Sequence, residues 1–508
     1  MTEQAQPNDG EPGNAPRLSR RRLLAAGGAT AALGALGAAV WLERPRTARH
    51  PAATSVSHSG AGLPAAGRPL RLAGSRPEPS RPAATDMLPG IDHFVILMLE
   101  NHSYDNLFGM LGRGPGQTPR GDGFTLGADG RPTATNPYGD GRIQHAFHMP
   151  TTCQLPGTPS QEWTAGHVAY NGGRNDGFVR APIGYGSSVP VGGVAMGYWT
   201  GEDLPFTYSL ATEFPIGDRW FCSVLGQTDP NRRYLIAGTS AGLTDDIGNG
   251  LSALQLPFPA NGTIFNTLDG YGISWANYVE SFPSGATPLL YPNDDLLTEE
   301  GHYHPFSQFY RDAAAGVLRS VSLLDPDYST QSQENPQNIV VGEALLARVV
   351  NTVGSSPQWP STVLIVMYDE HGGYYDHVPP PAAPRPDDIA PLLRPGQSAY
   401  EGFARYGFRV PSVVVGPYAK GQYVSHVAYD HTSVLAMIER KWNLPALTLR
   451  DANANDLTDF IDLKALAQKR PTFPTLPRLA PPGDTTAALA CSTRGPGTIP
   501  PPGSVTGG

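Results

Sequence analysis

The sequence predicts an α/β fold, in which helices cover both faces of a mostly parallel sheet. Three short apolar runs, 94–99, 362–368 and 410–415, are mostly β-branched and are bounded by polar or turn residues. Such runs are typical of strands that are buried on both faces. Helical patterns occupy 341–353 and 432–442. Strands of this kind together with helices indicate a layered α/β sandwich.

The composition limits the classes of function that we consider. The chain has 508 residues, of which 40% are hydrophobic, so it is long enough for one large domain or two ordinary ones. Its formal net charge is −9, which is unfavourable for binding a polyanion. We therefore expect no nucleic-acid partner.

Residues 1–42 have the pattern of an export signal. Arg20, Arg21 and Arg22 precede the weakly apolar, Ala- and Gly-rich run 23–42, which is typical of twin-arginine signals. A permanent anchor helix is the alternative, because the run is long enough to span a bilayer. We expect an exported protein that is secreted or associated with the cell envelope, and whether the signal is cleaved stays open.

Two segments flank the expected folded body at 88–468. Residues 43–87 and 469–508 are rich in Pro, Ala, Ser and Gly without periodicity, which predicts a flexible linker and a disordered tail. Three cysteines are too few for a disulfide framework. Cys153 and Cys222 are the better candidates for one bridge, and unpaired thiols are the alternative.

Acidic and amide side chains follow two of the predicted strands. Glu100 and Asn101 come after the first run, and Asp369 and Glu370 come after the second. Ligand sites in open α/β sheets lie beyond the carboxyl ends of the strands. Carboxylates buried there need a balancing cation, and an oxygen-rich set suits a divalent metal ion. The alternative is that these residues are ordinary polar ends of strands.

The segment 226–234 supplies a candidate nucleophile. We expect Thr228 to be the N-cap of a helix with Pro230 in its first turn. A hydroxyl there lies near the positive end of the helix dipole, where phosphate also binds, and a metal ion would activate it. Asn231 and Arg232 are then candidates for contacting phosphate oxygens. Taken alone, the segment predicts a helix start and no more.

A stiff loop follows the second strand at 369–381. Its paired glycines permit a close backbone approach, and its three consecutive prolines restrict the exit. His371 and His377 are candidates for donating to phosphate or transferring protons. Their alternative role is structural.

Four blocks of this chain resemble the phosphoesterase family that contains bacterial phospholipases C, plant non-specific phospholipases C and a group of bacterial acid phosphatases. The blocks occur in the order of the family. They comprise Glu-Asn-His-Ser-Tyr-Asp at 100–105, Gly-Gln-Thr-Asp-Pro-Asn-Arg at 226–232, Tyr-Asp-Glu-His-Gly-Gly to Pro380 at 368–380, and Gly-Phe-Arg-Val-Pro to Asp-His-Thr-Ser at 407–433.

The resemblance implies an alkaline-phosphatase-like three-layer sandwich whose catalytic domain is 88–468. It implies that Thr228 is the nucleophile, which forms a phospho-threonine that water hydrolyses. It also implies one divalent metal ion, with calcium preferred for an oxygen-dominated shell and iron, manganese or zinc as alternatives. The residues implied to hold this ion are Glu100, Asn101, Thr228, Asp369 and Glu370.

Further site residues follow from the same resemblance. His148 is the candidate for an upstream phosphate-contacting histidine, with His145 second, and His302 resembles a histidine of the acid phosphatases. Asn231, Arg232, His371 and His431 are the expected substrate-binding residues. One departure is that Asn335 stands where the family often has a histidine, which leaves the general acid unassigned.

The resemblance favours a phospholipase C, which cleaves glycerophospholipid to diacylglycerol and a phosphorylated head group. The threonine nucleophile and the Pro-rich loop after His377 favour this activity over an acid phosphatase acting on soluble phosphate monoesters. A catalytically inactive exported binding protein would lack a nucleophile or ligand, and all five candidates are present. A sulfatase would need a formylglycine-type motif, which none of the cysteines provides. Phosphocholine-preferring members of the family are longer and have extra C-terminal domains, so we do not expect a strict choline preference.

The expected partners are a phospholipid or phosphate-ester substrate and, transiently, a membrane surface. Tyr198, Trp199 and Phe206 are candidates for exposed apolar residues near the site, although we expect them in the core. Nothing in the sequence argues for more than a monomer.

Overall fold

The computed structural model describes residues 70–485 and 497–504, except for 156, 158, 185–186, 249–252, 281–285, 292–300, 329 and 335–336. The predicted twin-arginine segment, 1–42, lies outside these residues, as does Asn335. Within the described part of the chain, no helix is both long and apolar enough to cross a membrane.

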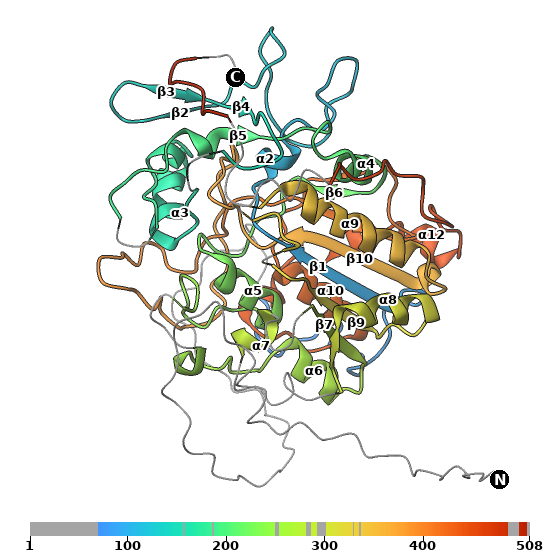
Figure 1. Cartoon of the computed structure of the whole chain (residues 1–508). Helices are drawn as coiled ribbons and strands as arrows, with labels where there is room; N and C mark the ends of the chain where they lie inside the picture. The colour runs from blue at the N-terminus through green and yellow to red at the C-terminus, as the bar shows by residue number, and fades with distance from the viewer. Residues whose placement is uncertain are drawn as a thin grey trace, which may run out of the picture. The chain divides into compact units, whose positions relative to one another are not determined.

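The centre of the fold is an eight-stranded sheet (Figure 1). Within the described strands, β11 runs antiparallel to its neighbours and the other seven run parallel to one another. Across the sheet, the order is β12 (Val424–Ser425), β6 (Ile216–Gly217), β11 (Ser412–Val415), β10 (Thr362–Tyr368), β1 (His93–Leu99), β9 (Val321–Asp325), β7 (Trp275–Val279) and β8 (Tyr303–Pro305).

The two central strands are those with the most apolar sequences. β1 and β10 pair in parallel from His93 opposite Thr362 to Leu99 opposite Tyr368. Every residue of β10 is buried, as is β1 after its first residue, as expected for strands covered on both faces. The third predicted strand begins at Ser412 rather than Val410, because Pro411 has no N–H to donate to a neighbouring strand.

Helices cover both faces of the sheet, which confirms the predicted α/β sandwich. In Figure 1, α9 lies in front of the sheet and α10 behind it. The Trp442 ring at the end of α10 packs on Phe94 of β1 at 5.8 Å between centroids. The larger helices are α5 (Thr228–Ala237), α8 (Phe306–Ala315), α9 (Ile339–Gly354) and α10 (Thr432–Trp442).

Smaller elements surround these layers. The shorter helices are α2 (Tyr104–Phe108), α3 (Trp163–Tyr170), α4 (Pro205–Glu213), α6 (Ile264–Gly270), α7 (Ala286–Leu290), α11 (Leu449–Ala452) and α12 (Leu463–Ala467). Two small sheets pair β2 (Thr135–Pro137) with β3 (Ile143–His145), and β4 (Phe147–His148) with β5 (Gly197–Tyr198).

The described part of the predicted flexible linker, 70–87, packs against the body. The Met87 N–H donates to the carbonyl of Lys441 at 2.7 Å, and Lys441 Nζ lies 2.6 Å from Asp86 Oδ1. The Asn443 amide donates to the carbonyls of Glu78, Arg81 and Pro82 at 3.0 Å each. Composition did not indicate this packing, because polar side chains of the body rather than apolar periodicity hold the segment.

The predicted disordered tail also packs in part. The Phe473 ring lies 4.5 Å from that of Phe214, and its carbonyl accepts from Trp359 Nε1 at 3.0 Å. A few apolar residues at irregular spacing therefore hold 470–485, where periodicity gives no signal.

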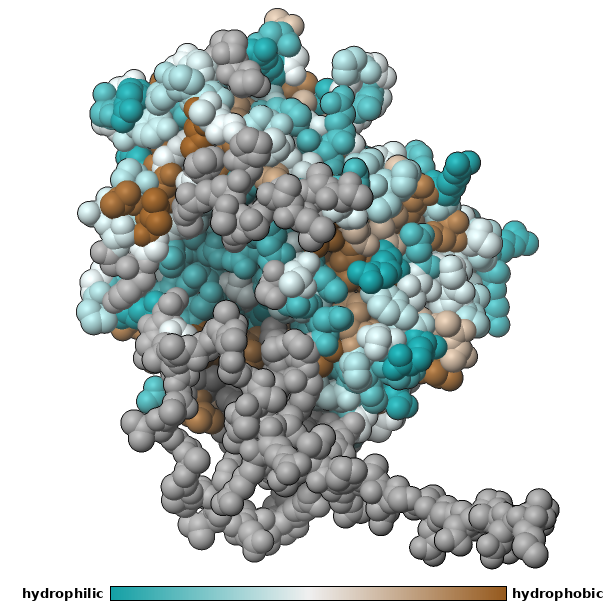
Figure 2. All heavy atoms as spheres, viewed as in Figure 1, coloured by the Kyte–Doolittle hydropathy of each residue, from teal (hydrophilic) through white to brown (hydrophobic). Residues whose placement is uncertain are grey.

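Two predictions about single side chains are decided by the fold. Cys222 is a buried free thiol and Cys153 is disulfide-bonded, so the Cys153–Cys222 bridge is wrong; Cys491 lies outside the described residues. Tyr198, Trp199 and Phe206 are buried, which confirms that they belong to the core. On the face seen in Figure 2, the exposed apolar residues occur in small separate groups among hydrophilic ones.

Candidate active site

The candidate site lies at the carboxyl ends of β1, β10 and β9. Glu100 and Asn101 follow β1, Asp369 and Glu370 follow β10, and Asp325 ends β9. The parallel register brings the first two pairs side by side. All five side chains are buried. The predicted convergence of acidic groups at this edge is thus present.

Arg232, in the second turn of α5, joins two of these carboxylates. Its Nη2 lies 3.1 Å from Glu100 Oε1 and its Nε lies 3.1 Å from Asp369 Oδ2. Its Nη1 donates to the Tyr328 hydroxyl at 2.7 Å. Because the guanidinium is buried and engaged by protein groups, these contacts assign it to holding the carboxylates rather than to binding phosphate.

Thr228 is the first residue of α5, and Gln227 rather than Thr228 is the N-cap, so the N-cap prediction is wrong. The Thr228 hydroxyl instead accepts from Asn101 Nδ2 at 3.3 Å. The Asp229 N–H donates to Asp246 Oδ1 at 2.8 Å and secures the first turn of the helix. Thr228 is half-buried, unlike Glu100, Asp369 and Glu370, which are buried.

The site holds more carboxyl groups than cationic side chains. Burial raises the pKa of Glu100, Glu370 and Glu334, and it raises that of Asp369 to about 8, with Arg232 opposing the shift. These shifts reflect carboxylates whose charge Arg232 does not fully balance.

The side chains fit a divalent cation in charge and in donor chemistry. Asn101 Oδ1 and Glu370 Oε1 are buried without a hydrogen-bond partner in the described structure, and both are oxygens of the kind that hard cations bind. Across the described ranges, however, no three His, Cys, Asp or Glu side chains are grouped so that they could hold a metal ion. Arg232 accounts for part of this, because it contacts an oxygen of Glu100 and one of Asp369.

Two of the predicted substrate-binding histidines lie behind the carboxylates. His431 Nε2 donates to the carbonyl of Asp369 at 2.7 Å, and His371 Nδ1 lies 3.1 Å from Glu370 Oε2. Burial lowers the pKa of His431 to about 4 and that of His371 to about 3, so both rings are neutral near neutral pH. The His431 contact positions the end of β10, whereas neither ring nitrogen of His371 has a hydrogen-bond partner in the described structure. Their roles in binding substrate stay predictions.

Asn231 does not face the site. Its Oδ1 accepts from the Val224 N–H at 3.1 Å, and its Nδ2 donates to the carbonyls of Gly226 and Gln227 at 3.0 Å each. The side chain is buried. It shapes the turn before Thr228, which corrects its predicted role in binding phosphate.

His377 belongs to a separate network with α2. Its Nδ1 lies 2.7 Å from Asp105 Oδ2 and its Nε2 lies 3.3 Å from Asp122 Oδ1. Arg409, which is fully buried, lies 2.9 Å from Asp376 and 3.1 Å from Asp105. None of these contacts joins His377 to Thr228, so the network anchors the loop after β10 and does not supply the predicted proton transfer.

The remaining histidines lie elsewhere. His148 Nε2 lies 2.7 Å from Asp203 Oδ2, and His145 ends β3; no described contact links either one to Thr228. His302 stacks on Trp275 at 3.9 Å, and Trp275 is level with the beginning of β1. Since β1 has seven residues and a strand rises about 3.3 Å per residue, His302 is roughly 20 Å from the site edge, and its predicted role is wrong.

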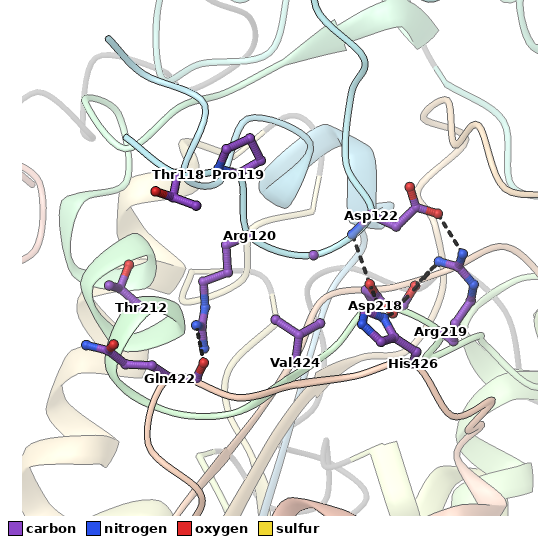
Figure 3. A pocket seen from close by; sticks show the side chains of 11 residues that line it. Thr118, Pro119, Arg120, Asp122, Thr212, Asp218, Arg219, Gln422, Val424 and His426 are labelled. Carbon is purple, nitrogen blue, oxygen red and sulfur yellow. Dashed lines mark hydrogen bonds and ion pairs between the residues drawn. The ribbon is translucent and has the colours of Figure 1, made fainter. Parts of the chain in front are cut away.

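Two surface cavities lie away from Thr228. One of about 920 Å³ is lined in part by Arg120, Asp122, Asp218, Arg219 and His426 (Figure 3). Figure 3 shows that its charged groups pair with one another, as Arg219 does with Asp122 and His426 with Asp218. The other cavity, of about 810 Å³, has His148 in its wall. Neither contains a residue of the Thr228 site.

The sequence prediction missed the loop between β9 and α9. Glu334 Oε1 accepts from Asn101 Nδ2 at 3.3 Å, and Ser332 Oγ donates to Glu100 Oε2 at 3.1 Å. Asp325, which lies 4.0 Å from Arg232 Nη1, directly follows the apolar run 321–324. The rule that located Glu100 and Asp369 would also have found Asp325. Glu334 directly precedes Asn335, in the segment where the family often has Glu-His-Pro, and this is the sequence signal that could have found it.

Comparison with known proteins agrees with the resemblance noted in the sequence. The model of the Phosphoesterase family matches residues 91–445. Phospholipase C A of Mycobacterium tuberculosis is 31% identical over 73% of this chain and 77% of the relative. Non-specific phospholipase C6 of Arabidopsis thaliana is 35% identical over 55% of each chain. Hemolytic phospholipase C of Pseudomonas aeruginosa is 29% identical over 75% of this chain and 57% of the relative.

A solved structure of a protein in the alkaline phosphatase superfamily from Vibrio parahaemolyticus covers 50% of this chain and 64% of its own, with a TM-score of 0.32 and 12% identity. A score this low supports no argument about function. The family match and the curated relatives cover most of the predicted catalytic domain. The chain therefore belongs to the phosphoesterase family and is a phosphoric ester hydrolase.

Proposed function

We propose that this protein is a metal-dependent phospholipase C that cleaves glycerophospholipids to diacylglycerol and a phosphorylated head group. The observation that carries the proposal is the half-buried Thr228, whose hydroxyl accepts from Asn101 at the start of α5, beside buried carboxylates. The names of the curated relatives, which include bacterial and plant phospholipases C, support the choice of leaving group.

In the proposed reaction, Thr228 Oγ1 attacks phosphorus and the bond from phosphorus to the glycerol oxygen breaks. The hydroxyl loses its proton, and the departing diacylglycerol oxygen gains one. Water then cleaves the phospho-threonine and restores the hydroxyl. The N-terminus of α5, a helix of ten residues, favours negative charge beside Thr228, and Asn101 orients the hydroxyl.

We also propose one divalent cation at this site, with calcium as the first candidate and manganese, iron or zinc as alternatives. When bound, it would balance the carboxylates and lower the pKa of the Thr228 hydroxyl. The residues proposed to hold it are Glu100, Asn101, Thr228, Asp369 and Glu370. The unpartnered oxygens of Asn101 and Glu370 support this choice.

Chelation tests the cation. We expect metal-free protein to melt at a lower temperature and to regain its stability when calcium is added, because the buried carboxylates lose their balancing charge. Melting is followed by calorimetry, and metal content is measured on the same samples. Equal melting temperatures for samples that differ in metal content would contradict the proposal.

The proposed activity is tested on two substrates side by side. Purified protein is given phosphatidylcholine in mixed micelles and a soluble phosphate monoester, with calcium present, and products are identified by mass spectrometry. We expect diacylglycerol and phosphocholine. Hydrolysis of the monoester with intact lipid would identify an acid phosphatase that uses the same residues.

Export by the twin-arginine route and a monomeric state remain part of the proposal. Activity in the culture medium or cell envelope that disappears when Arg20, Arg21 and Arg22 are replaced by lysine would support the export route.

A further inference from the structure

Exposed apolar side chains gather on two segments that hold α5, the helix that begins with Thr228. Among the described residues, thirteen large hydrophobic side chains are exposed, and six of them belong to these two segments. The six are Leu254, Phe258, Leu289, Leu392, Leu393 and Tyr400. We call this set the apolar rim.

The first segment of the rim is the loop 385–403. The Leu392 N–H donates to the carbonyl of Gly242 at 2.8 Å, and Arg394 Nη2 donates to that of Asp246 at 3.0 Å. Asp246 in turn accepts from the N–H of Asp229. Arg394, which follows Leu393, is therefore separated by two hydrogen bonds from Asp229, the residue next to Thr228.

The second segment consists of two stretches of chain, residues 254–258 before α6 and α7 at 286–290, and both contact α5. Arg233 of α5 donates to the carbonyl of Leu290 at 2.6 Å and to that of Pro257 at 3.3 Å. Leu289 and Phe258 are the chain neighbours of these two acceptors. Figure 1 shows α5 and α7 side by side. The two segments thus lie against the one helix whose first residue is the proposed nucleophile.

The exposed positions of the first segment are held in place. The Tyr400 ring stacks on His167 at 3.9 Å with 7° between the planes, and 45% of the residue is exposed. Its φ of 45° is in the left-handed region, which residues other than glycine rarely adopt. Trp163 Nε1 donates to the carbonyl of Ser398 at 2.8 Å. The loop is therefore fixed with its apolar side chains facing solvent.

We propose that the apolar rim docks the enzyme on the surface of a phospholipid aggregate and brings Thr228 to the lipid head groups. This inference rests on the proposed phospholipase activity. A lipid surface fits better than a second copy of the chain, because a stable protein interface needs about 800 Å² of complementary surface on each partner. The rim consists instead of two small groups of side chains.

Paired aspartate variants test the rim. One variant combines Leu254→Asp with Phe258→Asp, and the other combines Leu392→Asp with Leu393→Asp. Binding to phosphatidylcholine vesicles is measured by co-sedimentation, together with hydrolysis of a soluble phosphate ester. We expect each pair to weaken vesicle binding at least tenfold while hydrolysis of the soluble ester stays within twofold of wild type.

Val317→Asp is the matched control. Val317 is 56% exposed, and the Leu318 N–H beside it donates to Gln358, which contacts His93 at the first residue of β1. It therefore lies at the amino ends of the strands, away from Thr228. We expect its vesicle binding to equal that of wild type.

If both paired variants bind vesicles as wild type does, or if wild type does not bind them, the proposed docking role of the rim is wrong. A wild-type dimer that either pair dissociates would identify a second copy as the occupant and would also overturn it. If Leu392→Asp with Leu393→Asp does not fold, the more exposed Leu254 and Phe258 carry the test. Weakened vesicle binding in an enzyme that cleaves soluble monoesters but no lipid would refute the proposed function and leave the rim standing.

Discussion

Thr228 is half-buried, whereas Glu100, Asp369 and Glu370 are buried. We expect Thr228→Ala to lower kcat by at least about a thousandfold, because loss of a nucleophile removes the reaction path that it opens. The melting temperature should change little, since the hydroxyl accepts one hydrogen bond of 3.3 Å. Steady-state kinetics and thermal unfolding check the two parts.

Thr228→Ser is the control for this prediction. It keeps a hydroxyl at the first position of α5 and should retain measurable turnover. Alanine activity within about tenfold of wild type would remove Thr228 as the nucleophile.

Arg232 contributes differently, by balancing charge inside the protein. Removing one partner of a buried ion pair leaves an uncompensated charge and costs about 3–5 kcal/mol. We expect Arg232→Met to lower the free energy of unfolding by about that amount above about pH 8, where Asp369 is ionised. The loss should be smaller at neutral pH and smaller again in acid, because the pKa of Asp369 is about 8 in the folded protein and protonation removes the unbalanced charge. Urea unfolding at several pH values measures both effects.

Arg142 provides the comparison for Arg232. It pairs with Asp140 at 2.8 Å, but both side chains are more than half exposed, and exposed pairs contribute little. Arg142→Met should leave the free energy of unfolding unchanged. Equal effects of the two substitutions would show that Arg232 does not act through buried charge.

At the scale of single elements, the sequence predicted what depends on local pattern. The runs that became β1 and β10 are apolar throughout and buried on both faces, and the 432–442 helix has the predicted bounds. The carboxylates were found because the ends of parallel strands meet at one edge. The positions of the histidines were not predicted correctly, because a His-rich segment does not indicate which edge of the sheet it lies at. His302, for example, lies at the edge opposite to the carboxylates.

The loop after β10 is anchored to α2 by charged groups, and this anchoring depends on pH. Burial lowers the pKa of His377, but the charge and hydrogen bond of Asp105 and the bond to Asp122 outweigh it and raise the pKa to about 10. The folded pKa therefore exceeds the ordinary value of 6.5. The stabilisation is fully present below about pH 6.5 and is lost as the pH rises through about 10.

We expect His377→Gln to melt below wild type at about pH 6, with at least about half of that difference gone at about pH 10. Comparing the two proteins cancels groups that titrate in both. Calorimetry across this range gives the difference directly. A difference that stays constant or grows with pH would mean that His377 is not held in its charged form.

At the scale of the whole molecule, the site joins residues that are far apart in the sequence, from Glu100 to His431. The sheet brings the ends of β1, β9 and β10 together, α5 adds Thr228 and Arg232, and His431 binds the backbone at Asp369. Each of these residues belongs to, or directly precedes or follows, a strand or helix that packs in the core. We therefore expect the site to be as stable as the fold itself, without a separate opening transition.

The chain before β1 contributes to that stability, although its composition suggested a flexible linker. Lys441 is 2% exposed and its Nζ lies 2.6 Å from Asp86 Oδ1, while Asn443 binds three carbonyls of 78–82. A chain that starts at residue 88 loses this ion pair, the bond from Met87 and the three bonds of Asn443 together, and at about 0.5–1.5 kcal/mol for each hydrogen bond the loss amounts to about 3 kcal/mol or more. We expect it to melt about 5 °C lower than a chain that starts at residue 70.

Asp86→Asn in the chain that starts at residue 70 separates the ion pair from the rest of the segment. It keeps the backbone bond from Met87 to Lys441 and removes the charge that faces Lys441. About half of the loss or more should appear in this variant, because a buried charge without a partner is costlier than a missing hydrogen bond. Equal melting temperatures for the chains starting at 70 and 88 would return the segment to the role of a linker and would limit the folded domain to the residues after 87.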